Sequence, residues 1–156
     1  MPRIKTKRTK AAPEGFEQIK PTLTDFDHRL RKLQDNGASR MAAKANEGSW
    51  KVFQLTNERS RYIYDLYFKR KAISKELYDW LLRERYADKM LISKWKKRGY
   101  EKLCCLKCIQ SSESATQGNT CICRVPRATL VKNSSDGVVT FTRCVHCGCA
   151  GCSSSD

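Results

Sequence analysis

The stretch CVHCGCAGC (144–152) places four cysteines within nine residues and decides how the back third of this 156-residue chain folds. Two C-x-x-C pairs, Cys144/Cys147 and Cys149/Cys152, are joined by a C-x-C pair that uses one cysteine of each. A single tetrahedral zinc site needs only one C-x-x-C pair from each of two segments. A segment that shares members between pairs therefore predicts several metal ions held by common thiolates.

The number of cysteines supports the same interpretation. Two independent four-ligand zinc sites would use eight thiolates and leave one over, whereas three zinc ions need twelve ligand positions. Nine thiolates fill twelve positions if three of them bridge two ions. We therefore predict a shared-thiolate cluster of three zinc ions, with two ions as the fallback. Its ligands are all nine cysteines of the chain: Cys104, Cys105, Cys108, Cys121, Cys123, Cys144, Cys147, Cys149 and Cys152.

Other uses of the cysteines fit less well. An odd number leaves one thiol unpaired in a disulfide scheme, and iron–sulfur clusters take four thiolates each. His146 could replace a thiolate in a two-zinc scheme, but the thiols already suffice. Nine thiolates with three Zn²⁺ carry a net charge of −3, so cationic neighbours are expected to help. The nearest in sequence are Lys107, Arg124 and Arg143.

Charge divides the chain into two parts. Lys and Arg number 31 against 16 Asp and Glu, a formal net charge of +15. Residues 1–102 hold 26 of the basic and 13 of the acidic residues, whereas every cysteine lies beyond them. Such an excess favours a nucleic-acid partner over a merely solvated surface or an acidic membrane. No apolar run is long enough for a transmembrane helix, and the first ten residues lack the apolar core of a secretory signal.

Apolar periodicity predicts helices in the front two-thirds of the chain. Thr24 and Ser74 are the expected N-caps of two of them, and Asn36-Gly37 and Gly99 the expected ends of two. Arg59 interrupts an apolar stripe and is expected at its edge. The periodic segments are 24–36, 39–71, 73–86 and 87–102.

The predicted fold class is mainly α. We expect an extended basic arm (1–21), a small helical domain (22–102) and a loop-rich zinc-cluster module (103–156). The module has too few large apolar side chains for a core of its own, so metal is expected to stabilise it. Within it, CRVPRATL (123–130) and GVVTFTRC (137–144) are compatible with a short hairpin.

Three basic segments are candidates for RNA contact. The arm could equally be a disordered tail or a nuclear-import signal. RSRYIYDLYFKRK (59–71) interleaves aromatic and basic residues as a base-stacking surface does, although aromatic residues at helical spacing usually form core. Cations at the end of the fourth helix suit the helix dipole but are more numerous than a cap needs. The candidates are Arg3, Lys5, Lys7, Arg8, Lys10, Arg59, Arg61, Lys69, Arg70, Lys71, Lys94, Lys96, Lys97 and Arg98.

Longer motifs resemble a known family. MPRIKTKRTKAAPEGFEQIKPTLTDFD (1–27), RSRYIYDLYFKRKAISKELYDWLLRERYADK (59–89), EKLCCLKCIQ (101–110), TCICRVPR (120–127) and CVHCGCAGC are similar to the G-ten, or bud-site-selection, family of pre-mRNA splicing factors. The resemblance spans essentially the whole chain. It implies a nuclear core subunit of the spliceosome, associated with the nineteen complex and related factors, near small nuclear RNA and the intron. It also implies a helical domain followed by a three-zinc cysteine cluster.

We therefore expect a non-enzymatic subunit that braces scaffold proteins and contacts RNA through basic surfaces. The alternative is a DNA-associated transcription cofactor that meets a regulatory protein through its zinc module; a metal store fits the cysteines but not a large helical domain. Enzymatic activity is not expected, because thiolates fill every zinc position and no nucleophile–base pair is found. Neither a membrane nor a small-molecule substrate is expected as a partner.

Overall fold

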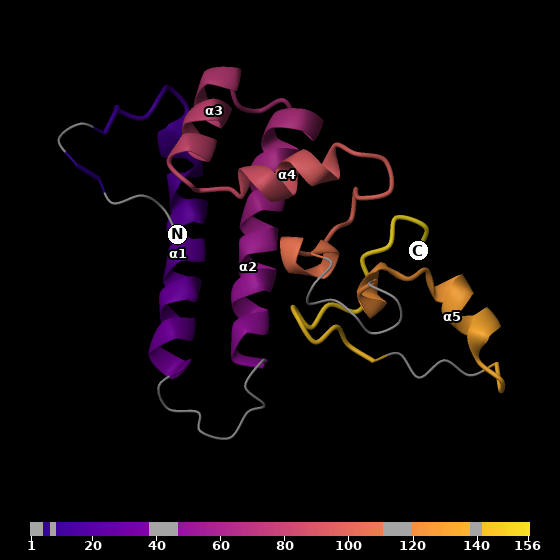
Figure 1. The fold of residues 1–156 in the computed structure, drawn as a ribbon. Coiled ribbons are helices and arrows are strands. Elements are labelled where there is room, and N and C mark those ends of the chain that lie inside the picture. The colour runs from indigo at the N-terminus through magenta and orange to yellow at the C-terminus, as the bar shows by residue number, and fades with distance from the viewer. Residues whose placement is uncertain (1–4, 7–8, 38–46, 111–119, 138–141) are drawn as a thin grey trace. The chain divides into compact units, whose positions relative to one another are not determined.

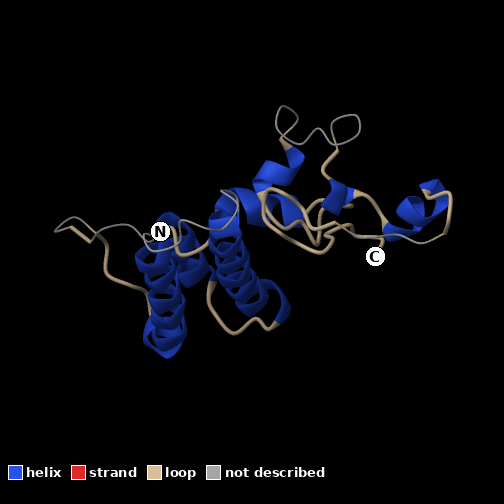
Figure 2. Cartoon of the chain, turned by 90° about the horizontal axis from the view of Figure 1, so that it is seen from below, coloured by secondary structure: helices blue, strands red, loops and turns tan. Residues whose placement is uncertain are grey.

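The computed structural model describes residues 5–6, 9–37, 47–110, 120–137 and 142–156. Within these ranges the chain forms helices and loops and no strand (Figures 1 and 2). The predicted mainly α fold class is thus confirmed. Across the same ranges, no helix is both long enough and apolar enough to cross a membrane.

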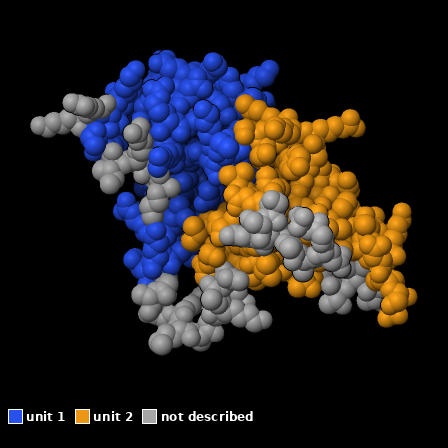
Figure 3. All heavy atoms as spheres, viewed as in Figure 1, with its two compact units in different colours: residues 1–41, 55–92 blue, residues 42–54, 93–156 orange. Residues whose placement is uncertain are grey.

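The chain divides into two compact units. Unit 1 comprises residues 1–41 and 55–92, and unit 2 comprises residues 42–54 and 93–156 (Figure 3). The domain limits expected from the sequence, 22–102 and 103–156, stay a prediction.

Helix α1 (Phe16–Gly37) begins earlier than the predicted N-cap and contains Pro21. A proline inside a helix costs about 3 kcal/mol. Burial of Phe16, which is 5% exposed, offsets much of this cost, and its ring centroid lies 5.0 Å from that of Trp80. Burying such a side chain stabilises by about 1.5–3 kcal/mol, and an aromatic pair adds about 1 kcal/mol. The prediction that Thr24 caps this helix was therefore wrong, because packing carries the helix past the proline.

Helix α2 (Glu47–Tyr64) continues into a π-helical turn, η1 (Asp65–Lys69). In unit 1, residues 55–64 of α2 lie alongside α1 (Figure 1). The two helices are joined by an ion pair between Arg59 Nη1 and Asp27 Oδ1, 3.0 Å apart.

Helix α3 (Lys75–Arg83) begins at the predicted cap. The Ser74 hydroxyl oxygen accepts a hydrogen bond from the Leu77 amide at 3.2 Å. Leu77, Trp80 and Leu81 are buried, as their helical spacing predicted.

Helix α4 (Lys89–Trp95) is the last helix of the expected set. Asp88 caps it, since its Oδ1 accepts from the Met90 and Leu91 amides at 3.0 and 3.1 Å. Trp95 is 2% exposed, and its indole N–H donates to the Leu103 carbonyl at 2.8 Å. Gly99, the expected stop, lies in the turn that follows, with a φ of +87°.

Unit 2 has little regular structure. Besides residues 47–54 of α2 and 93–95 of α4, its described residues form two 3₁₀ turns, η2 (Leu106–Ile109) and η3 (Ile122–Arg124), and helix α5 (Arg127–Asn133). Apart from Trp95 and Leu103, its buried apolar residues in the described ranges are cysteines. Within these ranges the cysteines therefore take the place of ordinary core side chains.

The short hairpin expected in this region was wrong. Residues 127–130 form the start of α5 in place of a strand, and residues 138–141 of the second expected strand lie outside the described residues. Pro126, with a φ of −57°, suits the start of a helix, and its carbonyl accepts from the Leu130 amide at 3.2 Å. The Asp156 carboxylate accepts from the Arg127 amide at 2.9 Å. This cap is supplied from a distant part of the sequence, so a local pattern could not reveal it.

Candidate metal centre and nucleic-acid interface

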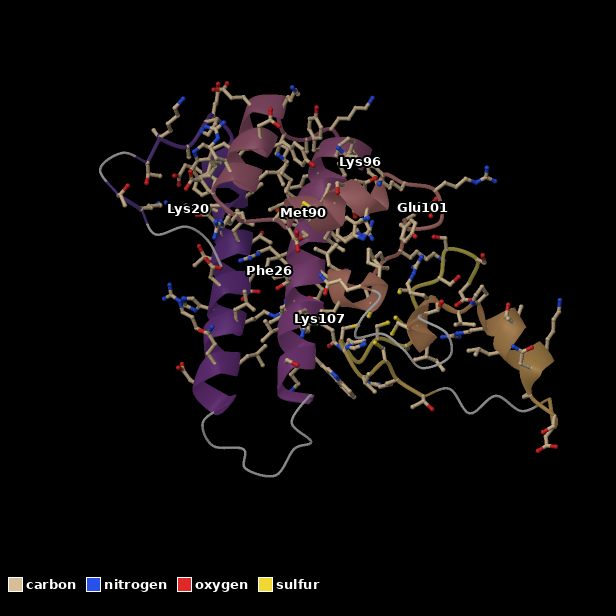
Figure 4. All side chains as sticks on the ribbon, in the orientation of Figure 1. Lys20, Phe26, Met90, Lys96, Glu101 and Lys107 are labelled. Carbon is tan, nitrogen blue, oxygen red and sulfur yellow. The ribbon has the colours of Figure 1, made fainter. Side chains whose placement is uncertain are left out.

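Three segments of unit 2 bring all nine cysteines together, and their sulfur atoms gather among its loops (Figure 4). The turn η2 carries Cys108, and η3 carries Cys123. In the last segment the Gly148 amide donates to the Cys144 carbonyl at 2.8 Å, and Gly148 has a φ of +65°. Glycine adopts this left-handed conformation without strain, which allows the tight turn between ligands.

The nine thiols form three groups of four. Within each group, all sulfur atoms lie within 4.8 Å of one another. The groups are Cys104, Cys105, Cys108 and Cys147; Cys104, Cys123, Cys149 and Cys152; and Cys108, Cys121, Cys123 and Cys144. Each group therefore offers the four thiolates that a closed structural zinc site takes.

Cys104, Cys108 and Cys123 each belong to two groups, and the other six cysteines belong to one. Nine thiols thereby offer twelve ligand positions, the number that the prediction of three zinc ions requires. The sequence could not tell which thiols are shared. In the structure, each pair of groups has one cysteine in common.

The spacing between sulfur atoms fits tetrahedral coordination. Bonds of about 2.3 Å from a zinc ion to sulfur place neighbouring ligands about 3.8 Å apart. The Cys104–Cys123 sulfurs are 3.8 Å apart, the Cys121–Cys144 sulfurs 3.3 Å and the Cys108–Cys147 sulfurs 4.0 Å. All nine cysteines are free thiols, so no disulfide competes for them.

Electrostatics also call for a cation among the thiols. Burial raises the pKa of the Cys121 thiol to about 12. Nine thiolates packed together would repel one another, and only bound cations allow them all to ionise. The cluster of donors therefore fits metal binding.

Arg124 is the cationic neighbour that contacts the cluster. Its Nη1 lies 2.5 Å from the Cys152 carbonyl and 3.6 Å from the Cys152 sulfur, and donates to both. Its Nη2 donates to the Gly99 carbonyl at 2.6 Å, and its guanidinium lies 5.0 Å from the Tyr100 ring centroid. Of the other two expected neighbours, Arg143 is exposed and Lys107, labelled in Figure 4, lies 5.6 Å from the Phe53 ring centroid.

Two residues that the sequence did not single out as site residues hold the last cysteine segment in place. Trp50 donates from its indole to the Val145 carbonyl at 2.9 Å, and Gln54 donates to the Cys147 carbonyl at 3.2 Å. A Cβ added at Gly148 would lie 2.4 Å from the Trp50 ring. Trp50 could be recognised in the sequence as apolar, but its partner 95 positions away could not.

His146 lies outside all three four-cysteine groups. Its backbone amide donates to the Cys144 sulfur at 3.3 Å. The thiol set is thus complete without an imidazole.

The RNA-contact candidates have different environments. Arg3, Lys7 and Arg8 lie outside the described residues, whereas Lys5 and Lys10 are exposed. Arg59 was expected at the edge of an apolar stripe, and this was wrong: it is 2% exposed. Burial lowers its pKa, which the Asp27 carboxylate opposes. This arginine serves the contact between α1 and α2, and its guanidinium is not presented at the surface.

One group of candidates directly follows an exposed aromatic residue in the sequence, and we call the four residues the Phe68 patch (Phe68, Lys69, Arg70 and Lys71). Phe68 is 37% exposed, and its ring centroid lies 4.8 Å from that of Tyr64. The three cations that follow it are exposed. The π-helical turn places this ring at the surface, beside the cations.

A second group of candidates, the Tyr100 patch, lies in unit 2 (Lys94, Lys96, Lys97, Arg98 and Tyr100). Tyr100 is 36% exposed, and the Lys94 ammonium lies 5.9 Å from its ring centroid. Lys96, labelled in Figure 4, Lys97 and Arg98 are exposed. Both patches therefore combine an accessible ring with several cations.

Known proteins match the chain along its length. The family model of Pre-mRNA-splicing factor BUD31 matches residues 1–154. Pre-mRNA-splicing factor BUD31 of Saccharomyces cerevisiae is 62% identical over 158 residues, which cover 100% of both chains. Pre-mRNA-splicing factor cwf14 of Schizosaccharomyces pombe is 53% identical over 156 residues, again 100% of both. Protein BUD31 homolog of Danio rerio is 46% identical over 153 residues, 98% of this chain and 99% of that one.

Proposed function

We propose a role for this chain on the premise that it belongs to the BUD31 family of pre-mRNA-splicing factors, as the match over residues 1–154 and full-length relatives establish. The chain is thus a splicing factor and not an enzyme. The finer proposal is that it is a nuclear core subunit of the spliceosome. There it braces proteins of the nineteen complex and related factors and contacts small nuclear RNA and the intron.

The metal centre is a three-zinc cluster in which Cys104, Cys108 and Cys123 bridge. This is supported by the membership of the groups: each of these three thiols belongs to two of the four-cysteine groups. Zinc supplies structural cross-links here, because a site closed by four thiolates has no open position for a substrate. The chain's own residues then do the rest: Arg124 offsets negative charge, and Trp50 and Gln54 hold the ligand loop.

The cluster makes unit 2 a rigid element built from loops. Metal binding and folding are coupled in small modules of this kind, so the loops that carry the Tyr100 patch are ordered when zinc is bound. Rigid placement of surface groups is what bracing neighbouring proteins requires.

RNA contact is assigned to the Phe68 patch, the Tyr100 patch and the basic residues of segment 1–21. Exposed rings can stack on bases whatever the sequence, and the cations neutralise phosphates. We expect steep salt dependence and no strong sequence preference, since no base-reading module is recognisable in the chain.

Ultraviolet crosslinking of purified spliceosomes, followed by mapping of nucleotide-bearing peptides, tests this assignment. We expect crosslinks at Phe68 or Tyr100, the exposed rings of the two patches. Complexes that contain the protein but give crosslinks only elsewhere on this chain would refute the two patches as RNA-binding surfaces. Duplex DNA that outcompetes spliceosomal RNA for the free protein would instead favour a DNA-associated role.

A further inference from the structure

A pocket in unit 1 is lined by none of the cysteines and by no residue of either patch. Its volume is about 390 Å³, which is within the range of about 300–1,000 Å³ typical of ligand pockets. Helices α2, α3 and α4 and the segment between the last two all contribute to it. The lining residues are Thr56, Arg59, Leu82, Arg83, Arg85, Ala87, Asp88, Lys89 and Met90.

The polar part of the lining is cationic. Arg83, Arg85 and Lys89 are exposed, and none of them forms an ion pair with the carboxylates in the described part of the chain. Arg59 is buried, and its Nε has no hydrogen-bond partner. The one acid, Asp88, already accepts two backbone amides at the start of α4. The pocket therefore offers several donors to an anion and little competing negative charge.

Arg85 reaches the pocket from a strained backbone. Its φ is +61°, a conformation that favours glycine. The Arg85 amide donates to the Leu82 carbonyl at 3.2 Å, and the Tyr86 amide to the Leu81 carbonyl at 3.0 Å. These two bonds define a Schellman motif at the end of α3, in which the left-handed position is usually glycine. The chain thus places a guanidinium at the pocket from a position where the backbone conformation alone would favour glycine.

Apart from Thr56, the rest of the lining is aliphatic. Leu82 and Ala87 form part of it, and Met90, labelled in Figure 4, is 61% exposed. No aromatic ring belongs to the lining, so a nucleobase would find nothing to stack on. A carboxylate beside an aliphatic side chain complements both halves of the pocket.

We propose that this pocket binds an acidic peptide segment of a protein partner, with a carboxylate held by Arg83, Arg85 and Lys89 and an aliphatic side chain against Leu82 and Met90. This goes beyond RNA contact, since it gives unit 1 a defined docking site for protein. Arg–carboxylate pairs can be bidentate, which would orient the peptide as well as hold it.

Methyl NMR on the full-length, zinc-loaded chain tests the proposal. The chain has three methionines, so labelling their methyl groups gives a simple spectrum in which Met90→Leu identifies the Met90 signal. The probe is a synthetic peptide of alternating glutamate and leucine, and its glutamine–leucine counterpart is the uncharged control. We expect a saturable shift of the Met90 signal with the acidic peptide only.

Arg85→Gly is the decisive variant, because it removes the cation and also relieves the backbone. We expect peptide affinity to fall about tenfold, the effect of losing one charge-assisted hydrogen bond, while thermal stability stays equal or rises. Lys71→Gly is the matched control: Lys71 also has a positive φ, +51°, but does not line the pocket. Arg83→Gln is a second variant, which leaves the backbone unchanged.

Several results would overturn the proposal. One is a Met90 signal that does not move at millimolar peptide. Another is an equal loss of affinity in Arg85→Gly and Lys71→Gly, which would mean binding to net charge alone. A third is a uridine oligonucleotide that shifts Met90 more than the peptide does and loses this effect in Arg85→Gly; the pocket would then be an RNA contact.

Discussion

Serine substitutions at the two members of the C-x-C pair Cys121/Cys123 compare a thiol shared by two four-thiol groups with a thiol that belongs to one. Cys123 belongs to two of the three four-thiol groups, whereas Cys121 belongs to one. Both side chains are buried, at 0% and 2% exposure, and they lie two positions apart. Serine at either position is therefore a matched change that differs mainly in how many metal sites it damages.

The expected magnitudes follow from this membership. A structural zinc site in a small peptide binds with about 10–16 kcal/mol, or roughly 3 kcal/mol for each of its four ligands. Cys121→Ser should weaken one site by about that amount, and Cys123→Ser should weaken two sites, roughly 6 kcal/mol in all. The larger loss is comparable with the whole stability of a typical domain, about 5–15 kcal/mol. We expect Cys121→Ser to retain two zinc ions and Cys123→Ser at most one.

Native mass spectrometry gives zinc ions per chain, and limited proteolysis reports whether unit 2 stays folded. Circular dichroism should show that the helices of unit 1 persist in both variants. His146→Ala is the control and should keep all three ions. The reasoning would be refuted if both serine variants lost the same number of ions, or if the wild-type chain bound only two.

Four further substitutions test other parts of the structure. Gly148→Ala forces a side chain into a φ of +65° and to within 2.4 Å of Trp50; we expect unit 2 to lose at least about 2 kcal/mol in urea unfolding. Gly137→Ala, with a φ of +64° but open space, should cost only about 1 kcal/mol. Arg59→Met leaves a carboxylate without its ion-pair partner at the contact between α1 and α2 and should cost about 3 kcal/mol, so an unchanged melting temperature would contradict the role of this pair. Burial raises the pKa of Tyr78 to about 12, above the unfolded value of about 10. Its contribution to the free energy of unfolding is therefore complete below pH 10 and is lost as pH rises toward 12. Wild type should lose up to about 2 kcal/mol more than Tyr78→Phe between about pH 9 and 11.5 in urea unfolding, and equal losses would exclude this residue as the cause.

We expect bound metal to affect function by ordering the loops of unit 2. Unit 2 has few buried apolar side chains in its described ranges other than cysteines, so we expect its loops to depend on bound metal for a fixed arrangement. The Tyr100 patch begins in α4 and continues into those loops. Removing zinc should therefore weaken any contact that this patch makes before it affects unit 1.

Local signals in the sequence were sufficient for several elements. Ser74 capped its helix as predicted, because a serine oxygen satisfies an amide only a few residues away. The nine thiols come together in three groups of four, as their number and spacing indicated. The long motifs also identified the family, which the match over residues 1–154 confirms.

Tertiary contacts decided what the sequence could not show. Phe16 holds α1 past a proline by packing against Trp80, and Asp156 caps α5 from a distant segment. Which thiols are shared depends on how three separate segments meet, and no spacing within one segment specifies that. The residue types determine which contacts a side chain can make. Burial and long-range packing decide which of these contacts form, because segments distant in the sequence meet only in the folded chain.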